Sequence, residues 1–265
     1  MRESLSSRAG ATRVVIHGAA GRVGARLCDL AHRDDTIALV GAIVRAGSPR
    51  LGHASAPASH KGESVVLSGP DAPRVACDVV IDFSGDEGAP RALALAQAGG
   101  AALLVGTTAL SAKSIDALRA ASNRQAVLVA ANTALGVAVL ATLVRAAAEA
   151  LGTGFTASIV EAHHAAKKDA PSGTAKRLAA AIRDAGNTGS PLRDDQVVAI
   201  RGGDVVGEHT VRFAGPGEYV EFTHRATTRD VFALGALRAA RWLHGRGPGW
   251  WTTEDVLGLA TPRTR

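Results

Sequence analysis

The chain has 265 residues, which is long enough to bury a sizeable core and more than one typical domain needs. Its 30 Lys and Arg residues against 24 Asp and Glu give a net charge of +6, which could serve a polyanionic partner. The positive residues are spread along the chain and aromatic residues make up only 3% of it, so we predict a solvated basic surface and no nucleic-acid partner.

The two cysteines, Cys28 and Cys77, lie in apolar segments and form no CxxC pair, which argues against a disulfide framework and favours a reducing, cytoplasmic location. Residues 1–11 contain no apolar stretch and are expected to be a tail rather than an export signal. The uncharged stretches 92–112 and 126–144 are alanine-rich and interrupted by glycine or polar residues, so we expect buried elements and no membrane span.

The first half alternates short β-branched runs with alanine-rich stretches, a pattern typical of a parallel sheet covered by helices. Strands are predicted over residues 13–17, 38–44, 79–83, 101–105 and 127–130, and helices over 22–32, 88–98, 111–121 and 136–151. Residues 46–73 are rich in Gly, Ser, Pro and His, which predicts a long connection with at most one short strand. We therefore expect a doubly wound α/β domain.

A glycine-rich loop follows the first predicted strand and opens the first predicted helix. Gly18, Gly21 and Gly24 are spaced GxxGxxG, which permits a tight turn, close approach of the backbone to a pyrophosphate and close packing of helix on strand. After the second strand stands Arg45, where an acidic residue would bind the ribose of NAD, so a 2′-phosphate fits better. We expect a nicotinamide cofactor, NADPH or NADH, with NADPH favoured.

Small polar residues follow three later strands of this half. Asp82-Phe83-Ser84, Gly106-Thr107-Thr108 and Ala130-Ala131-Asn132-Thr133 fall at carboxyl ends of strands, where open α/β sheets bind their ligands. We expect the nicotinamide to lie near these loops, although each loop taken alone also fits an ordinary turn or helix cap.

After residue 152 the pattern indicates an open, mostly antiparallel sheet. Strands are predicted over residues 155–161, 196–201, 208–213 and 219–224, and helices over 174–185, 231–243 and 253–259. Gly215-Pro216-Gly217 predicts a tight turn between the last two strands. The second half is therefore expected to be an α+β domain.

A histidine–lysine segment is the most informative part of the second half. It contains His163, His164 and Lys167, and Pro171 disfavours helical geometry just before itself, so we predict a loop over residues 163–170 and then a helix that starts near Ser172. Such a helix start would aim backbone N–H groups at an anion while the histidines and the lysine supply proton donors and positive charge. The segment favours a small carboxylated substrate.

Other interpretations of this segment stay open. Adjacent histidines on an extended strand point to opposite faces, so one of them could be a packed structural residue. A metal site would need a third ligand such as His209, His224 or Glu161, and because no HxH or HExxH spacing supports one, we predict no metal. Three of the five lysines fall within residues 167–176, which favours proton transfer by at least one of them.

From Glu161 to Thr174 the chain reads E-x-H-H-x-x-K-x-D-A-P-S-G-T. With the glycine loop, the strand-end loops and Gly207-Glu208-His209-Thr210, this segment resembles the 4-hydroxy-tetrahydrodipicolinate reductase (dihydrodipicolinate reductase) family over most of the chain. The resemblance implies an oxidoreductase of lysine and diaminopimelate biosynthesis. It would transfer a hydride from NADPH or NADH to 4-hydroxy-tetrahydrodipicolinate, with loss of water, to give tetrahydrodipicolinate.

The resemblance also implies a division of labour between two domains. Residues 1–131, completed by 245–265, would form a Rossmann-like cofactor domain, and residues 132–244 would bind substrate and build a homotetramer. Two alternatives remain on the same architecture: a related amino-acid dehydrogenase that acts on another small carboxylate, and a non-catalytic dinucleotide-binding sensor.

Residue roles follow from the resemblance position by position. His163 would be the proton donor/acceptor and Lys167 a proton donor, and the substrate carboxylate would be bound by His164, Gly173 and Thr174. The cofactor contacts would be Gly18, Ala19, Ala20, Gly21, Arg22, Val23, Gly106, Thr107, Thr108, Ala130, Ala131, Asn132 and Thr133, to which the residue pattern adds Arg45. The chain departs from some members at Ala165 and Ala166, where they carry basic residues.

Overall fold

The computed structural model describes residues 10–56, 64–186 and 189–260, so most of the expected N-terminal tail lies outside the described residues. The chain divides into two compact units. The first unit comprises Met1–Ala134 and Phe232–Val256, and the second comprises Leu135–Val231 and Leu257–Arg265. Residues 232–244, expected in the second domain, thus belong to the first unit, because their helix packs into its core.

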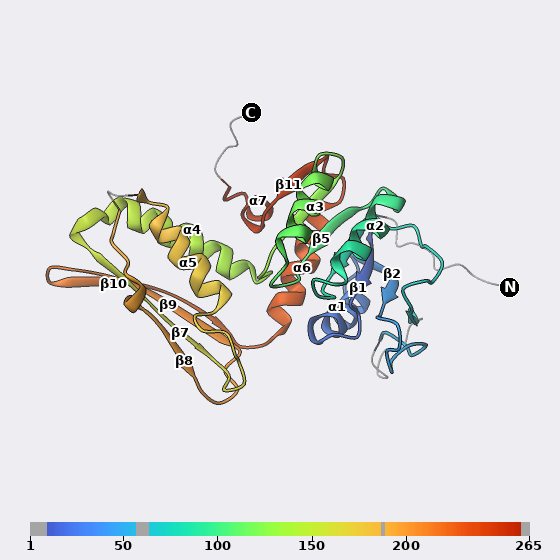
Figure 1. The fold of residues 1–265 in the computed structure, drawn as a ribbon, viewed down its shortest axis with the longest axis horizontal. Helices are drawn as coiled ribbons and strands as arrows, with labels where there is room; N and C mark the ends of the chain where they lie inside the picture. The colour runs from blue at the N-terminus through green and yellow to red at the C-terminus, as the bar shows by residue number, and fades with distance from the viewer. Residues whose placement is uncertain (1–9, 57–63, 187–188, 261–265) are drawn as a thin grey trace. The chain divides into compact units, whose positions relative to one another are not determined.

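The first unit is built on a seven-stranded sheet in which every neighbouring pair of strands is parallel (Figure 1). The strands are β1 (Thr12–His17), β2 (Ile37–Ile43), β3 (Leu67–Ser68), β4 (Val79–Asp82), β5 (Ala102–Val105), β6 (Ala126–Val129) and β11 (Gly249–Trp251). Their order is β11-β6-β5-β4-β1-β2-β3, so the direction of winding reverses between β1 and β4. This is the doubly wound order expected of a dinucleotide-binding sheet, and the predicted Rossmann-like fold is confirmed.

Helices cover both faces of this sheet. Helices α1 (Arg22–Arg33) and α6 (Asp230–Leu243) place Leu27 and Leu237 in one buried cluster, which includes Ile16 of β1. Helices α2 (Ala89–Gly99) and α3 (Ala112–Ser122) belong to a second cluster, which includes Val80 and Leu103 of the strands between them. The strands are short and rich in Val, Ile and Leu because both of their faces are buried. The short helix α7 (Thr253–Leu257) follows β11.

The second unit is a four-stranded mixed sheet with the order β10-β9-β7-β8. Its strands are β7 (Thr156–His163), β8 (Val197–Arg201), β9 (Gly207–Gly215) and β10 (Glu218–Ala226). β9 pairs antiparallel with β7 and β10, and Gly215-Pro216-Gly217 forms the predicted hairpin turn, whereas β8 runs parallel to β7. Helices α4 (Leu135–Leu151) and α5 (Gly173–Arg183) pack on one face, and the 3₁₀ turns Gly152–Gly154 and Asp194–Gln196 precede β7 and β8.

Strand alternation decides which side chains of the second unit meet the helices. Along β7 the residues at 157, 159, 161 and 163 are buried, whereas Thr156 and Val160 are exposed. This period places Glu161 and His163 side by side on the covered face. The opposite face carries exposed apolar residues, among them Val198 and Ile200 of β8.

Helix α4 with its following turn, Leu135–Gly154, is the one span in the described residues long and apolar enough to cross a membrane by length and composition. Val144 and Ala148 on this helix are fully buried in a cluster with Phe213 of β9. We therefore interpret α4 as the core helix of its unit.

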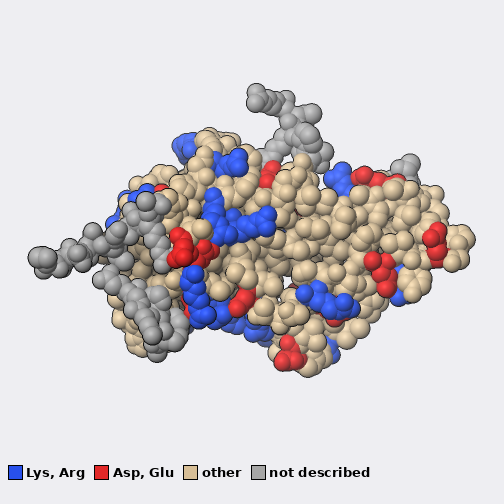
Figure 2. All heavy atoms as spheres, turned by 180° about the vertical axis from the view of Figure 1, so that it is seen from behind, with Lys and Arg blue, Asp and Glu red and all other residues tan. Residues whose placement is uncertain are grey.

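Charged side chains of both signs alternate on one face of the molecule (Figure 2). On the face drawn in Figure 2, Lys and Arg form separate groups with Asp and Glu between them, rather than one continuous basic stripe. Ion pairs such as Arg26–Asp29 and Arg183–Asp194 tie many of these arginines to neighbouring carboxylates.

Candidate functional site

The glycine loop of the first unit connects β1 to α1 at the carboxyl edge of the sheet. Gly18 has a φ of +84°, and a Cβ placed there would lie 2.6 Å from the carbonyl oxygen of Phe83. A Cβ on Gly24 would lie 2.1 Å from the carbonyl oxygen of Gly18, so the helix can approach the loop only without side chains at these positions. The predicted steric roles of both glycines are confirmed.

Only some backbone N–H groups of the glycine loop can bind an anion. The N–H groups of Gly18 and Ala19 donate to the carbonyl oxygen of Ile43 at 2.9 and 3.0 Å, so they are already used. Helix α1 begins at Arg22 with Gly21 as its N-cap, and no side chain caps it. Its first-turn amides at residues 22–24 are therefore the ones that could bind a pyrophosphate.

The other predicted cofactor residues lie at the carboxyl ends of the strands of this unit. Arg45 is exposed just after β2, and Arg22 is exposed at the start of α1. Thr108 and Ala131 are exposed after β5 and β6. The remaining residues named for this site are Ala20, Val23, Gly106, Thr107, Ala130, Asn132 and Thr133, all of which belong to the same unit.

Several of these residues have structural roles. A Cβ on Gly106 would lie 2.1 Å from the Phe83 ring. The Thr133 hydroxyl donates to the carbonyl oxygen of Phe232 at 2.7 Å, and the Asn132 side-chain oxygen accepts from the Ala134 N–H at 2.9 Å. Asn132 thus shapes the turn after β6 through a local hydrogen bond, and Thr133 ties this turn to α6.

A buried polar network joins three of these strand ends where the winding reverses. His17 and Asp82 are paired in register at the ends of β1 and β4, and His17 Nδ1 lies 2.7 Å from Asp82 Oδ1. Asp82 is fully buried and also accepts from the hydroxyls of Ser84 at 2.5 Å and Thr107 at 3.0 Å. The network fixes the loops after β1, β4 and β5 relative to one another.

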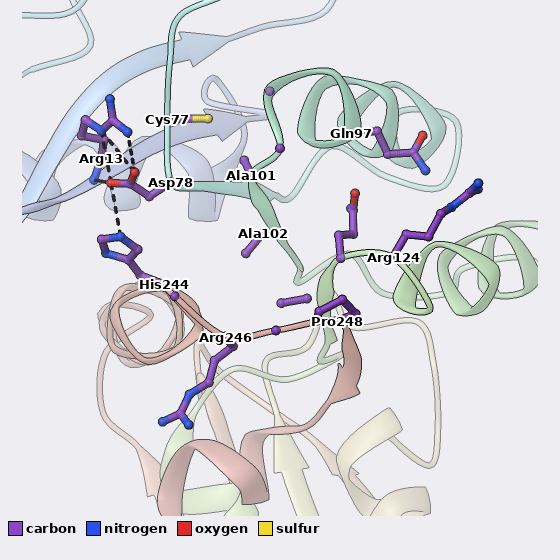
Figure 3. Close-up of a pocket in the computed structure, with 16 residues that line it drawn as sticks. Arg13, Cys77, Asp78, Gln97, Ala101, Ala102, Arg124, His244, Arg246 and Pro248 are labelled. Carbon is purple, nitrogen blue, oxygen red and sulfur yellow. Dashed lines mark hydrogen bonds and ion pairs between the residues drawn. The ribbon is translucent and has the colours of Figure 1, made fainter.

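A cavity of the first unit lies at the opposite edge of the sheet, away from the glycine loop. Its volume is about 830 Å³, and Figure 3 shows the ion pair of Arg13 and Asp78 on its wall with His244 beside it. Arg13, Asp78 and Gln125 stand at the amino ends of their strands. Since open α/β sheets bind nucleotides at the carboxyl edge, this cavity is not the cofactor site.

In the second unit, the buried carboxylate of Glu161 organises the histidine–lysine segment. It accepts from His163 Nδ1, from the Ser172 N–H at 3.0 Å and from both Nη atoms of Arg201 at 2.9 and 2.8 Å. Glu161 is fully buried and His163 is 9% exposed. His163 is thus the packed histidine of the pair, while His164 is half-buried.

The loop after β7 carries the lysine. Lys167 Nζ donates to both carboxylate oxygens of Asp169 at 2.7 and 2.9 Å, and its backbone N–H closes a turn on the carbonyl oxygen of His164. Helix α5 then begins at Gly173, between the predicted start near Ser172 and the predicted helical range from residue 174, with Ser172 as its N-cap. The Ser172 hydroxyl accepts from the Ala175 N–H, and the helix starts at exposed Gly173 followed by half-buried Thr174.

His209 completes this cluster from β9. Its ring lies edge-on to that of His163 with centroids 5.1 Å apart, and its Nε2 lies 3.1 Å from the Ser172 hydroxyl. Glu161, His163 and His209 lie close enough together to hold a metal ion. However, Arg201 already pairs with both oxygens of the buried Glu161, so an ion would have to displace this guanidinium.

Burial and charge set the protonation of these groups. Burial lowers the pKa of His209 to about 4 and also lowers the pKa of His163, although the carboxylate of Glu161 opposes the shift at His163. Burial alone would raise the pKa of Glu161, but hydrogen bonds from Arg201, His163 and Ser172 outweigh it and lower that pKa. Near neutral pH the cluster therefore contains an ionised carboxylate beside neutral imidazoles.

This arrangement suits proton transfer beside a bound anion. A buried carboxylate orients one nitrogen of an imidazole and leaves the other free to exchange a proton. An ammonium group and the start of a helix add positive potential close by in the chain.

Sequence reasoning did not find all of these residues. Arg201 and the roles of His17 and His209 were not predicted, and for Ser172 only the place at the start of the helix was predicted. Glu161 had a signal, because an acidic residue two positions before His163 on a strand must share its face. Arg201 had none, because its place depends on the parallel pairing of β8 with β7.

Comparison with known proteins covers both units. The family model described as "Dihydrodipicolinate reductase, N-terminus" matches residues 12–133, and the one described as "Dihydrodipicolinate reductase, C-terminus" matches residues 136–257. Two relatives named 4-hydroxy-tetrahydrodipicolinate reductase come from Anaeromyxobacter dehalogenans and Stenotrophomonas maltophilia. The first relative is 42% identical, over 94% of this chain and 98% of its own length. The second is 44% identical, over 92% of this chain and 97% of its own length.

A solved structure agrees with the fold. The dipicolinate-bound dihydrodipicolinate reductase from Paenisporosarcina sp. TG-14 superposes with a TM-score of 0.74 and 18% identity, over 92% of this chain and 98% of that one. An amine dehydrogenase from Mycobacterium smegmatis has a TM-score of 0.57 at 13% identity, so the architecture is shared more widely than the sequence motif. Both family models and the identity to these relatives show that the chain belongs to the dihydrodipicolinate reductase family.

Proposed function

We propose that this chain reduces 4-hydroxy-tetrahydrodipicolinate to tetrahydrodipicolinate, with loss of water, in lysine and diaminopimelate biosynthesis. Membership of the reductase family supports the reaction class. The observation that carries the proposal is the buried pair of Glu161 and His163 beside the start of α5, in a segment that resembles the motif of the family. The amino-acid dehydrogenase alternative has the architecture in common, and the histidine–lysine segment is the feature that favours the reductase over it.

In the proposed reaction the bound nicotinamide supplies the hydride, and the second unit supplies protons and positive charge. Hydride addition leaves negative charge on the substrate, which a positioned acid must neutralise. His163 would exchange a proton through Nε2, and Lys167 would donate one. His164 and the backbone of Gly173 and Thr174 would hold a carboxylate of the substrate.

A coupled assay tests the reaction. The protein would be mixed with freshly made product of the condensation of pyruvate and aspartate semialdehyde, and NADPH or NADH oxidation would be followed by absorbance. We expect oxidation with at least one cofactor. If neither cofactor is oxidised above background, the proposal is wrong. Oxidation that is independent of this substrate would favour a different dehydrogenase.

The cofactor preference is proposed to depend on Arg45. Its side chain is exposed at the carboxyl end of β2, the position where a 2′-phosphate is recognised in this architecture. Arg45→Ala should raise the KM for NADPH about tenfold and change the KM for NADH little, since one charge-assisted contact is lost only with the phosphate. Exposed Arg238 on α6 supplies a matched control, and equal effects on both cofactors would contradict this role.

We also propose that the second unit assembles the chain into a homotetramer in the cytoplasm. The uncovered face of its sheet carries Val198 at 48% and Ile200 at 51% exposure, an apolar surface suited to a second copy. Buried free thiols at Cys28 and Cys77 suit a reducing compartment. Light scattering should show that Val198→Glu dissociates the oligomer, while Val75→Glu, at a similarly exposed site in the first unit, leaves it intact.

A further inference from the structure

Both carboxylate oxygens of Glu161 accept two hydrogen bonds each. Its Oε2 accepts from His163 Nδ1 and from Arg201 Nη1, and its Oε1 accepts from Arg201 Nη2 and from the Ser172 N–H. The side chain is fully buried, so all four donors come from protein. A fully satisfied buried carboxylate can hold its neighbours in one geometry.

Arg201 connects this carboxylate to the loop that carries the lysine. While its two Nη atoms hold Glu161, Nη2 also donates to the carbonyl oxygen of Asp169 at 2.6 Å. The side chain of Asp169 in turn holds Lys167 Nζ. Arg201 stands opposite His163 in the register of β7 and β8, which is why its side chain reaches the same face of the sheet.

We propose that Glu161 and Arg201 are positioning residues for the reaction, which fix His163 in the tautomer that carries its proton on Nδ1 and presents Nε2 for proton exchange. The inference rests on the proposed function of His163 and adds the two residues that orient it. An ionised carboxylate can only accept a hydrogen bond, so the His163 nitrogen that faces Glu161 must carry a hydrogen.

The surroundings of the other ring nitrogen agree with this assignment. A Cβ on Gly207 of β9 would lie 3.1 Å from His163 Nε2, so the absence of a side chain there leaves space beside that atom. Within the described residues, Nε2 has no hydrogen-bond partner, whereas Nδ1 is held.

The guanidinium has a function that a lysine could not replace. Arg201 binds both oxygens of Glu161 through a planar fork, and the same group reaches the Asp169 carbonyl. A lysine ammonium at this position would keep the charge but would make one directed contact where the fork makes two.

Charges on every element around His163 act on its protonation. Glu161 on the same strand favours the imidazolium, whereas Lys167 on the loop and Arg201 on β8 disfavour it, and His209 on β9 is neutral near pH 7. Removing the charge of Glu161 should therefore lower the pKa of His163, and removing the charge of Arg201 should raise it. The two substitutions should therefore shift the pKa of His163 in opposite directions, and the tautomer of His163 reports the positioning itself.

The experiment compares Glu161→Gln, Arg201→Met and Arg201→Lys with Arg183→Lys, which alters an exposed arginine–carboxylate pair on α5 of the same unit. We expect kcat to fall about ten- to a hundredfold in the three test variants, with cofactor binding by NADPH fluorescence unchanged. The limb of the pH profile that belongs to His163 should move to lower pH in Glu161→Gln and to higher pH in Arg201→Met. Arg183→Lys should behave as wild type.

A readout without activity separates this inference from the proposed function. In protein labelled with ¹⁵N-histidine, with the signal assigned through His163→Asn, neutral His163 should show a protonated Nδ1 and an unprotonated Nε2. If the wild type is inactive but shows this tautomer, the proposed function fails and the positioning role stands. A wild type with the proton on Nε2 overturns the inference, as do full activity in the test variants or limbs that move in the same direction.

If Arg201→Met does not fold, as judged by circular dichroism, the positioning role is tested by the kinetics of Arg201→Lys and by the tautomer of His163 in the wild type. Arg201→Lys with wild-type kcat and an unchanged pH profile would contradict the proposed role of the fork.

Discussion

A methyl group at Gly207 tests whether His163 works through Nε2. An alanine Cβ there would lie 3.1 Å from Nε2 and 3.4 Å from Cδ2 of the His163 ring, against about 3.5–4.0 Å for relaxed contacts. The methyl would occupy space within hydrogen-bond reach of Nε2, and the ring would have to shift by about 0.3–0.5 Å to relieve the contact. We expect kcat/KM to fall about ten- to a hundredfold, or about 1.4–2.7 kcal/mol of transition-state stabilisation.

The fold should tolerate this change. Gly207 lies outside the left-handed region, so alanine adds no backbone strain, and its smaller loss of chain entropy on folding offsets part of the contact cost by about 0.4–1 kcal/mol. Gly202→Ala is the matched control, because a Cβ there meets nothing within 4 Å. Steady-state kinetics of both variants, with thermal melts as a check of folding, decide the question. A Gly207→Ala protein that folds normally and keeps wild-type kcat/KM would refute proton exchange through Nε2.

Three further predictions concern protonation, thiol reactivity and packing. Because burial lowers the pKa of His209 from 6.5 to about 4, the unfolded chain binds a proton that the folded chain refuses, so stability should decline as pH falls from about 6.5 to about 4. Urea melts across this range should show a shallower pH dependence in His209→Gln, and identical slopes would contradict the assignment. Burial raises the pKa of Cys28 to about 12 and that of Cys77 to about 11. A thiol reagent at pH 8 should therefore label both cysteines quickly in denaturant and neither quickly in the folded protein. Rapid labelling of the folded protein would contradict the burial of these thiols. Phe213→Ala, at a fully buried site between sheet and helices, should lower the free energy of unfolding by about 3–5 kcal/mol in denaturant melts, whereas Tyr219→Ala, which is 60% exposed, should change it little.

Most elements of the fold follow from local pattern. The β-branched runs and alanine-rich stretches of the first half predicted β1, β2, β4, β5 and β6 with their helices, because buried parallel strands and amphipathic helices have distinct periods. Two features could not be predicted in this way. The strand Gly249–Trp251 is three residues long and acquires meaning only by pairing with β6, and α6 joined the first unit through tertiary packing of small residues.

The candidate site was predictable where its residues are consecutive. The loop around Gly18 and the segment from His163 to Ser172 combine steric and chemical requirements within a few positions, so spacing alone indicated them. Arg201 and His209 could not be found in this way, because the sheet register brings them to Glu161 across 40 and 48 positions of the chain. Residues of this kind can be found only once the pairing of the strands is known.

The most direct test of the account combines the coupled reductase assay with cofactor binding for the wild type, His163→Ala and Lys167→Ala. If the second unit supplies the protons and the first unit binds the cofactor, the wild type will oxidise NADPH or NADH in the presence of fresh substrate. Both variants will then lose kcat by about a hundredfold or more while they bind NADPH as tightly as the wild type. Variants that retain full kcat, or that lose activity only because they no longer bind NADPH, would contradict the account.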